Sequence, residues 1–195
     1  MRRRKVTTTL IVIAGMLVLG VAGMFVMSLT AGRPNNLGVQ DGRLAEAPSS
    51  PNCVSTQTDD RSHWIAPIRF EGSADEAMQT IAAVVGQMSG STIIEQEPTY
   101  LYAEFRSSIF RFVDDVEFLI EPESGRIHFR SASRVGHSDL GANRNRMEQF
   151  RTLFESQYTA AGERGPADST AADAGDNDTS QGAAADSEQP TAASL

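Results

Sequence analysis

The chain has 195 residues, and 25 acidic against 17 basic side chains give it a formal net charge of −8. This balance excludes nucleic acid as a partner, because binding to phosphates requires clustered positive charge. Cys53 is the single cysteine. An intramolecular disulfide therefore cannot form, and the folded part must be stabilised by its own hydrophobic core.

The first 31 residues predict a membrane anchor. Residues 1–5 form a basic N-terminus, and residues 6–31 contain no ionisable side chain. Such a run exceeds the ~20 apolar residues that a helix needs to cross the hydrocarbon layer. The alternative is a cleaved secretory signal, whose apolar core is shorter, ~7 to 15 residues, and ends in a small-x-small cleavage site. Leu29-Thr30-Ala31 matches such a site poorly, so we predict an uncleaved transmembrane helix.

The distribution of basic residues predicts how the anchor is oriented. Four cations precede the apolar run, and Arg33 follows shortly after it. Because cytoplasmic flanks are enriched in Lys and Arg, we expect a cytoplasmic N-terminus and a single-pass protein of the cell inner membrane. The remainder of the chain is then periplasmic or otherwise extracytoplasmic.

Composition divides the exported part into three segments. Residues 32–47 are rich in Gly, Pro, Asn and Ala, and residues 159–195 are dominated by small and acidic residues. Neither can bury enough apolar surface to offset the entropy of ordering. We therefore predict a flexible linker over 32–47, a globular domain over 48–158 and a disordered acidic tail over 159–195.

The globular segment predicts an α+β fold. An edge strand is expected at 63–70, and a helix opens at the capping box of Ser73 and Glu76 and ends near Gly90. Strand-like runs follow at 92–97, 100–107, 112–120 and 127–133, and a second helix runs from residue 140 to about 158. Because the breaks between the four runs are too short for crossover helices, the strands must pair as an antiparallel meander.

The order of elements is thus β-α-β-β-β-β-α, with both helices packed on one face of the sheet. Side chains alternate between the two faces of a strand. The predicted core face carries Leu101, Ala103, Phe105, Val116, Phe118, Ile120, Ile127 and Phe129.

The other face of the meander is highly charged. If Ile120 lies opposite Ile127, Glu117 falls opposite Arg130. One interpretation is a solvated face with cross-strand ion pairs, and the other is a shallow polar ligand cleft, which needs a loop or the linker to wall it off. The candidate ligand-binding residues of this face are Glu104, Asp115, Glu117, Arg130 and Arg134.

Residues 130–146 connect the last strand to the second helix and hold further polar candidates. Exposed amides at a helix start, with Ser138, Asn143 and Arg144 nearby, suit a small anion, but a capping Asp139 competes for the same amides. Asp114 falls on the apolar face, so we expect it to accept hydrogen bonds from Ser131, Ser133 or the amides around Gly136. Asp114, Ser131, Ser133 and Asp139 are therefore predicted to be structural.

The remaining reactive side chains offer a weaker, catalytic interpretation. Cys53 with His63 or His137 supplies the residue types of a thiolate nucleophile and its base. No local signature of a cysteine hydrolase accompanies them. The histidines lack metal-ligand spacing, so we expect no metal and no cofactor.

Several motifs together resemble the DUF1499 family, whose members occur in bacteria and plant plastids. They are Pro51-Asn52-Cys53-Val54-Ser55, the stretches 100–105 and 112–118, and the run 130–144. The resemblance covers about residues 48–158 and implies that Pro51 to Ser55 belong to the domain, but it implies no reaction. We therefore expect a non-catalytic binding module for a partner protein or small anionic ligand, with a Cys53 hydrolase as the alternative.

Overall fold

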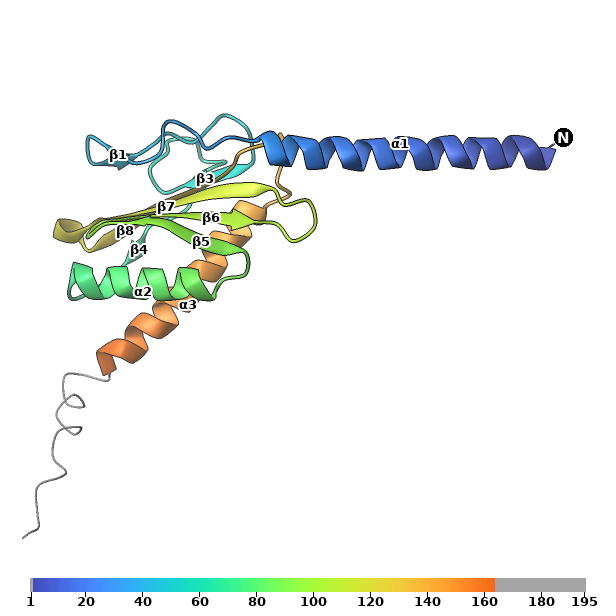
Figure 1. Cartoon of the computed structure of the whole chain (residues 1–195). Helices are drawn as coiled ribbons and strands as arrows, with labels where there is room; N and C mark the ends of the chain where they lie inside the picture. Colours follow the sequence, from blue (N-terminus) through green and yellow to red (C-terminus); the bar gives the residue numbers. More distant parts are fainter. Residues whose placement is uncertain (1, 164–195) are drawn as a thin grey trace, which may run out of the picture.

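The computed structural model describes residues 2–163 (Figure 1). Its helices are α1 (Arg2–Thr30), α2 (Ala74–Gln87) and α3 (Ala142–Glu163), with a 3-10 turn η1 (Pro122–Ser124). Its strands are β1 (Val39–Gln40), β2 (Arg43–Leu44), β3 (Cys53–Ser55), β4 (Ile68–Arg69), β5 (Ser91–Gln96), β6 (Tyr100–Arg106), β7 (Val113–Glu121) and β8 (Arg126–Ser133). From residue 164 onward, the predicted tail lies outside the described residues.

The main sheet is antiparallel, with the order β3-β8-β7-β6-β5, and β4 also pairs with β8. Strands β5 to β8 form the predicted meander, because consecutive strands are hydrogen-bonded neighbours. Ile120 lies opposite Ile127, and Glu117 lies opposite Arg130. The α+β fold class and the register expected from the alternation of side chains are therefore confirmed.

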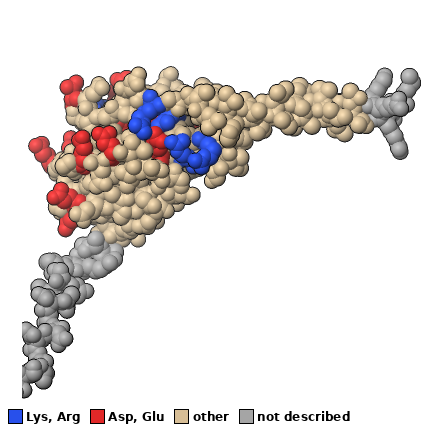
Figure 2. Space-filling view, in the orientation of Figure 1, with Lys and Arg blue, Asp and Glu red and all other residues tan. Residues whose placement is uncertain are grey.

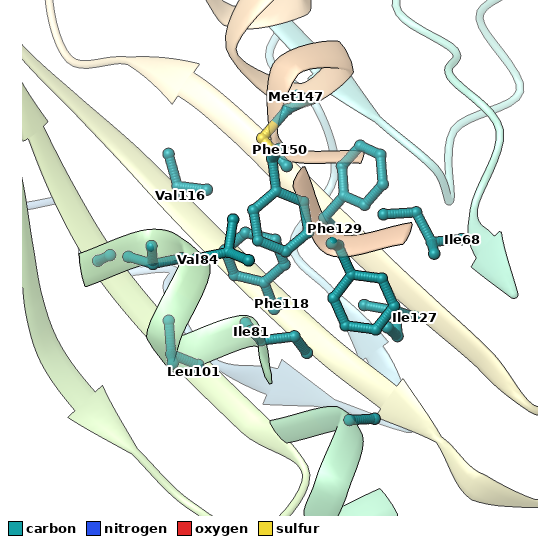
Figure 3. Close-up of a cluster of buried hydrophobic side chains, with 14 of the residues drawn as sticks. Ile68, Ile81, Val84, Leu101, Val116, Phe118, Ile127, Phe129, Met147 and Phe150 are labelled. Atoms are coloured by element: carbon teal, nitrogen blue, oxygen red, sulfur yellow. The ribbon is translucent and has the colours of Figure 1, made fainter. Parts of the chain in front are cut away.

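Helices α2 and α3 cover one face of this sheet (Figure 1). The core between them contains Ile81 and Val84 from α2 and Phe150 from α3, which pack on the strands (Figure 3). The rings of Phe118 and Phe150 lie 4.5 Å apart between centroids. All the side chains predicted for the core face are buried, and burial of each large one stabilises the fold by about 2 kcal/mol.

One short strand and one isolated bridge replace the single edge strand predicted over residues 63–70. Only Ile68–Arg69 pairs with β8 there, and Trp64 forms an isolated parallel bridge with Ser55. Pro67 has no amide hydrogen and interrupts the ladder. The rest of this edge of β8 is taken by β3, where Cys53 lies opposite Ala132.

Helix α3 begins two residues later than predicted. Leu140, expected on the apolar side of this helix, has a φ of 55° and is 93% exposed. The Asp139 carboxylate accepts from the amides of Gly141 and Asn143 at 3.0 and 2.8 Å. The helix starts after Gly141, because Leu140 and Gly141 have positive φ angles, 55° and 82°, which a right-handed helix does not allow.

Helix α1 projects from the domain (Figure 1). Its segment Val6–Thr30 is long and apolar enough to cross a membrane, and none of its most apolar window is buried within the protein. Ser28, near its C-terminal end, is buried. The end of α1 is therefore packed against the domain.

Residues 33–47, here called the covering segment, lie over the face of the sheet opposite α2 and α3 (Figure 1). Strands β1 and β2 form a hairpin within it, in which Asp41 and Gly42 both have positive φ angles, 52° and 73°. This turn conformation matches the twist of a two-residue hairpin. The segment thus differs from the flexible linker expected over residues 32–47, because it folds onto side chains that its own composition does not reveal.

Candidate functional site

The charged residues predicted on β6, β7 and β8 form one buried cluster. Arg134 Nη2 lies 2.5 Å from Glu104 Oε1 and 2.7 Å from Asp115 Oδ1. Arg130 Nη1 lies 3.2 Å from Glu117 Oε2. Glu104, Asp115, Glu117 and Arg130 are each at most 4% exposed. The ion pairs that we predicted are present, but the solvated face is wrong.

The covering segment is what removes these side chains from water. Its Gly38 amide donates to Glu117 Oε1 at 2.7 Å, and Arg33 Nη2 donates to Glu104 Oε1 at 2.9 Å. Arg130 Nε donates in return to the Glu46 carbonyl at 3.4 Å. The covering segment and the charged face therefore satisfy each other's polar groups.

A small apolar cluster fixes the same segment to the sheet. Leu44 is buried together with Tyr100, Tyr102 and Leu119, and Leu37 packs against them. The hydroxyls of the two tyrosines reach the buried carboxylates. Tyr100 donates to Glu117 at 2.9 Å, and Tyr102 donates to Asp115 at 2.6 Å. Apolar and polar contacts thus hold the segment at one place.

The environment changes the pKa values of these groups in opposite directions. Burial disfavours the charged form of Glu104, but hydrogen bonds from Arg134 and Arg33 outweigh it and lower its pKa to about 2. Burial raises the pKa of Glu117, against the hydrogen bond from Gly38 and the charge of Arg130. Burial also raises the pKa of Tyr102. Among these groups, Glu104 is therefore held as a carboxylate across the physiological pH range.

A cleft of about 360 Å³ opens beside this cluster, between the covering segment and strands β5 and β6. Its size falls within the range of about 300 to 1,000 Å³ that ligand sites occupy. One wall is formed by Arg33, Pro34, Asn35, Leu37, Gly38 and Val39, and the other by Glu95, Glu97, Tyr100 and Tyr102. The Arg33 guanidinium lies over the Tyr102 ring, 5.3 Å from its centroid. Since Glu95 and Glu97 are exposed, the cleft presents negative charge to solvent.

The turn over residues 134–141 holds its own polar groups internally. Asp139 occupies the amides at the start of α3, as described above, and Ser138 Oγ accepts from the Leu140 amide at 3.3 Å. Arg144 Nη2 donates to the carbonyls of Ser62 and Trp64. These hydrogen bonds tie the start of α3 to the loop that contains Ser62 and Trp64. The donors around the turn are therefore already used and do not favour an anion.

Asp114 has a different partner from the one expected. It lies opposite Ser133, as predicted, but its carboxylate is paired with Arg146 at 2.5 Å. Ser131 and Ser133 instead contact Asn143, which is buried. An arginine one turn into α3 reaches further than a serine hydroxyl, and its charge offsets the cost of burying a carboxylate.

The three catalytic candidates do not form a site. Cys53 is buried and its thiol donates to the Pro48 carbonyl at 3.4 Å. Burial raises the pKa of this thiol to about 11, which disfavours the thiolate. His63 lies 3.4 Å from Asp60, and His137 is exposed. Within residues 2–163, no hydrogen bond joins the thiol to either histidine, and no group of three or more His, Cys, Asp or Glu is placed to hold a metal ion.

The walls of the cleft contain residues that the sequence did not single out. Arg33 and Gly38 belong to the segment expected to be a linker, and Glu95 and Glu97 belong to an edge strand without a motif. The sequence signal for this segment is indirect: Leu37, Val39 and Leu44 are larger apolar residues within a stretch of mostly polar and small residues.

The comparisons with known proteins bear on the family alone. Searches of curated proteins and of solved structures give no significant match. The model of a protein family of unknown function, DUF1499, matches residues 43–154, which is more than half of the chain. The match includes β2 of the hairpin, every strand of the main sheet and the charged cluster. The chain therefore belongs to the DUF1499 family.

Proposed function

We propose that the protein is a membrane-anchored, non-catalytic binding module of the extracytoplasmic space. Helix α1 is the anchor, and the basic residues Arg2 to Lys5 retain its N-terminus in the cytoplasm. The protein is then a single-pass protein of the cell inner membrane, with its domain in the periplasm. The binding site lies close to the membrane, because Arg33 of the cleft follows the end of α1 by three residues.

The ligand that suits the cleft is an extended protein segment with a basic side chain. The observation that carries this proposal is the pair of exposed carboxylates, Glu95 and Glu97, on a cleft wall that also holds two tyrosines. A Lys or Arg side chain forms charge-assisted hydrogen bonds with such exposed carboxylates, whereas the buried Tyr100 and Tyr102 rings shape the wall behind them. Arg33, on the opposite wall, is paired with Glu104, so among the described residues the two exposed carboxylates are the unpaired charges nearest a ligand on the β5 side.

Strand β5 supports the same kind of partner. In the described sheet it pairs with β6 on one side and ends the strand order on the other. Its outer edge therefore presents backbone amides and carbonyls that an extended peptide can pair with. Glu95 lies on this strand and Glu97 directly follows it.

The buried charged cluster has a positioning role in this proposal. Glu104, Asp115 and Arg134 hold Arg33 and the Tyr102 hydroxyl, which form part of the cleft. Glu117 and Arg130 hold the covering segment at Gly38 and Glu46. The charged face thus shapes the binding site without contacting the ligand.

The other two hypotheses receive less support. Anion binding at the turn needs unpaired donors, whereas the Gly141 and Asn143 amides donate to Asp139. Arg144 and Arg146 are also engaged. A Cys53 hydrolase needs an accessible thiolate, whereas Cys53 is buried with a raised pKa.

Titration of the full chain in detergent micelles with two short peptides tests the proposed site. Both are capped, extended heptapeptides that alternate Val and Thr, with a central Lys in one and a central Glu in the other. We expect NMR shift changes in β5 and the cleft with the Lys peptide, and at least about tenfold weaker binding of the Glu peptide, equivalent to 1.4 kcal/mol.

The double variant Glu95→Gln with Glu97→Gln should remove this preference for Lys. Glu123→Gln, an exposed change in η1, serves as the matched control and should retain it. Equal binding of the two peptides, or stronger binding of the Glu peptide, would contradict the proposed ligand class.

The anchor and its orientation are tested separately. Alkaline phosphatase fused after the C-terminus is active only when exported, so an active fusion is expected. The intact mass of the membrane-extracted chain should include α1. An inactive fusion, or a mature chain that lacks residues 6–31, would refute the anchored topology.

A further inference from the structure

The loop between β6 and β7 exposes apolar side chains at its tip. It comprises residues 107–112, and Ile109 is 78% exposed. The loop is closed at its base, since the Ser107 amide donates to the Phe112 carbonyl at 2.9 Å and Ser107 Oγ accepts from the Phe112 amide at 3.0 Å. The Phe110 and Phe112 rings lie 5.6 Å apart. The apolar tip is thus presented on an ordered base.

This tip lies beside α1. Ile109 and Phe110 form one wall of an apolar groove, and the other wall is Leu17, Val18, Val21, Ala22 and Phe25 of α1. Figure 1 shows the loop extending from the sheet toward the helix. The groove connects the domain to a part of α1 well before the end of that helix.

The position of those α1 residues sets the depth of the loop in a membrane. A hydrocarbon layer of about 30 Å takes about 20 residues of helix, at about 1.5 Å per residue. The apolar helical segment Val6–Thr30 has 25 residues. Whichever stretch of that length lies in the hydrocarbon, it includes the span from Leu17 to Phe25. Side chains that contact this span from the exported side therefore reach the acyl chains.

We propose that the β6–β7 loop inserts Ile109 and Phe110 into the outer leaflet, so that the domain contacts the bilayer at a second point besides α1. This inference rests on the proposed anchorage of α1. The occupant of the apolar groove is then the acyl chains of lipids. Two attachment points fix the tilt of the domain, and with it the height of the cleft above the membrane.

The charges around the loop fit this placement. Arg111 is exposed directly after the tip, and Arg33 and Arg106 have half-exposed side chains. On the face in Figure 2, basic side chains gather near the junction with α1, while acidic side chains gather toward the opposite end of the domain. Arginines at the level of the lipid phosphates are favoured, and acidic groups are favoured farther from an anionic surface.

Fluorescence of the full chain in vesicles tests the insertion. The chain is reconstituted in phosphatidylcholine–phosphatidylglycerol vesicles, and the single native Trp64 is replaced by Trp64→Phe. Phe110→Trp then reports on the tip, and Glu123→Trp reports on η1, which lies at the other end of β7. Lipids brominated in the middle of the acyl chain quench only a tryptophan within the hydrocarbon.

We expect blue-shifted emission from Phe110→Trp, and quenching by brominated lipid that is severalfold stronger than for Glu123→Trp. Equal quenching at the two positions overturns the insertion. Protection of Phe110→Trp from aqueous acrylamide without quenching by brominated lipid also overturns it, because a protein contact then covers the tip.

Flotation of the vesicles separates this inference from the proposed anchorage. A chain that floats with the vesicles and shows no quenching at Phe110→Trp retains the anchor and refutes only the loop insertion. A chain that fails to float refutes both.

Discussion

The Gly38 amide donates to Glu117 Oε1 at 2.7 Å, although the two residues are 79 positions apart in the chain. Glu117 is fully buried and also contacts Tyr100 and Arg130. One carboxylate therefore joins the covering segment to β6, β7 and β8. The segment that follows the apolar helix is consequently a part of the folded domain.

Loss of the Glu117 side chain should destabilise the domain. In Glu117→Ala the Gly38 amide and the Tyr100 hydroxyl lose their shared acceptor, and the buried Arg130 loses its counter-charge. We expect a loss of about 3 kcal/mol in the free energy of unfolding, measured by urea denaturation. The exposed change Glu123→Gln should stay within about 0.5 kcal/mol of the wild type, and equal effects of the two changes would refute the structural role of this pair.

Glu104 should make stability depend on pH in the acid range. Its pKa in the folded protein is about 2, below the ordinary value of 4.5. Its contribution is therefore complete above pH 4.5 and is lost as pH falls toward 2. The stability difference between wild type and Glu104→Gln, on the order of 3 kcal/mol at pH 7, should shrink from pH 5 to pH 3 in urea denaturation. A difference independent of pH would contradict this assignment.

Asn143 should be the most sensitive polar residue of α3. Its buried amide donates to the carbonyl of Asn52, directly before β3, at 2.8 Å and accepts from Arg146 at 2.7 Å. Asn143→Ala removes these hydrogen bonds from a buried site, together with those to Ser131 and Ser133, and we expect a loss of about 3 kcal/mol in thermal or urea unfolding. The exposed Asn145→Ala, two positions along the same helix, is the control. Similar losses in both variants would show that helix propensity, and not the network, is responsible.

The Cys53 thiol should react slowly while the protein is folded. With a pKa of about 11 against the ordinary 9.0, its thiolate fraction at pH 8 is about a hundredfold lower than that of a free thiol. Labelling by iodoacetamide should therefore be at least about a hundredfold slower in buffer than in urea. Cys53→Ser should leave binding of the Lys peptide unchanged. Rapid labelling in buffer, or loss of binding in a folded Cys53→Ser variant, would revive the hydrolase hypothesis.

Local patterns were sufficient to predict most of the fold. The alternation of Phe118 and Ile120 with Glu117 identified the core face, because strand side chains point to opposite sides whatever the rest of the chain does. The capping box of Ser73 and Glu76 is present at the start of α2, since its hydrogen bonds span three residues only. Contacts of this range are encoded in neighbouring positions.

The candidate site could be predicted only in part. The pairing of Glu117 with Arg130 followed from the register of one hairpin. The burial of that pair did not, because it depends on Gly38 and Leu44, which lie outside the meander. Likewise, the choice of Arg146 as the partner of Asp114 depends on how α3 crosses the sheet.

The sequence by itself determined the apolar helix, the meander and its two chemically distinct faces, because each follows from the spacing of side chains along a short stretch of chain. Only the tertiary structure decided that the charged face is also covered, instead of facing water. A polar stretch rich in Gly and Pro has no intrinsic preference for order. It becomes ordered here because carboxylates and tyrosines more than 50 positions away complete its hydrogen bonds and its small apolar cluster.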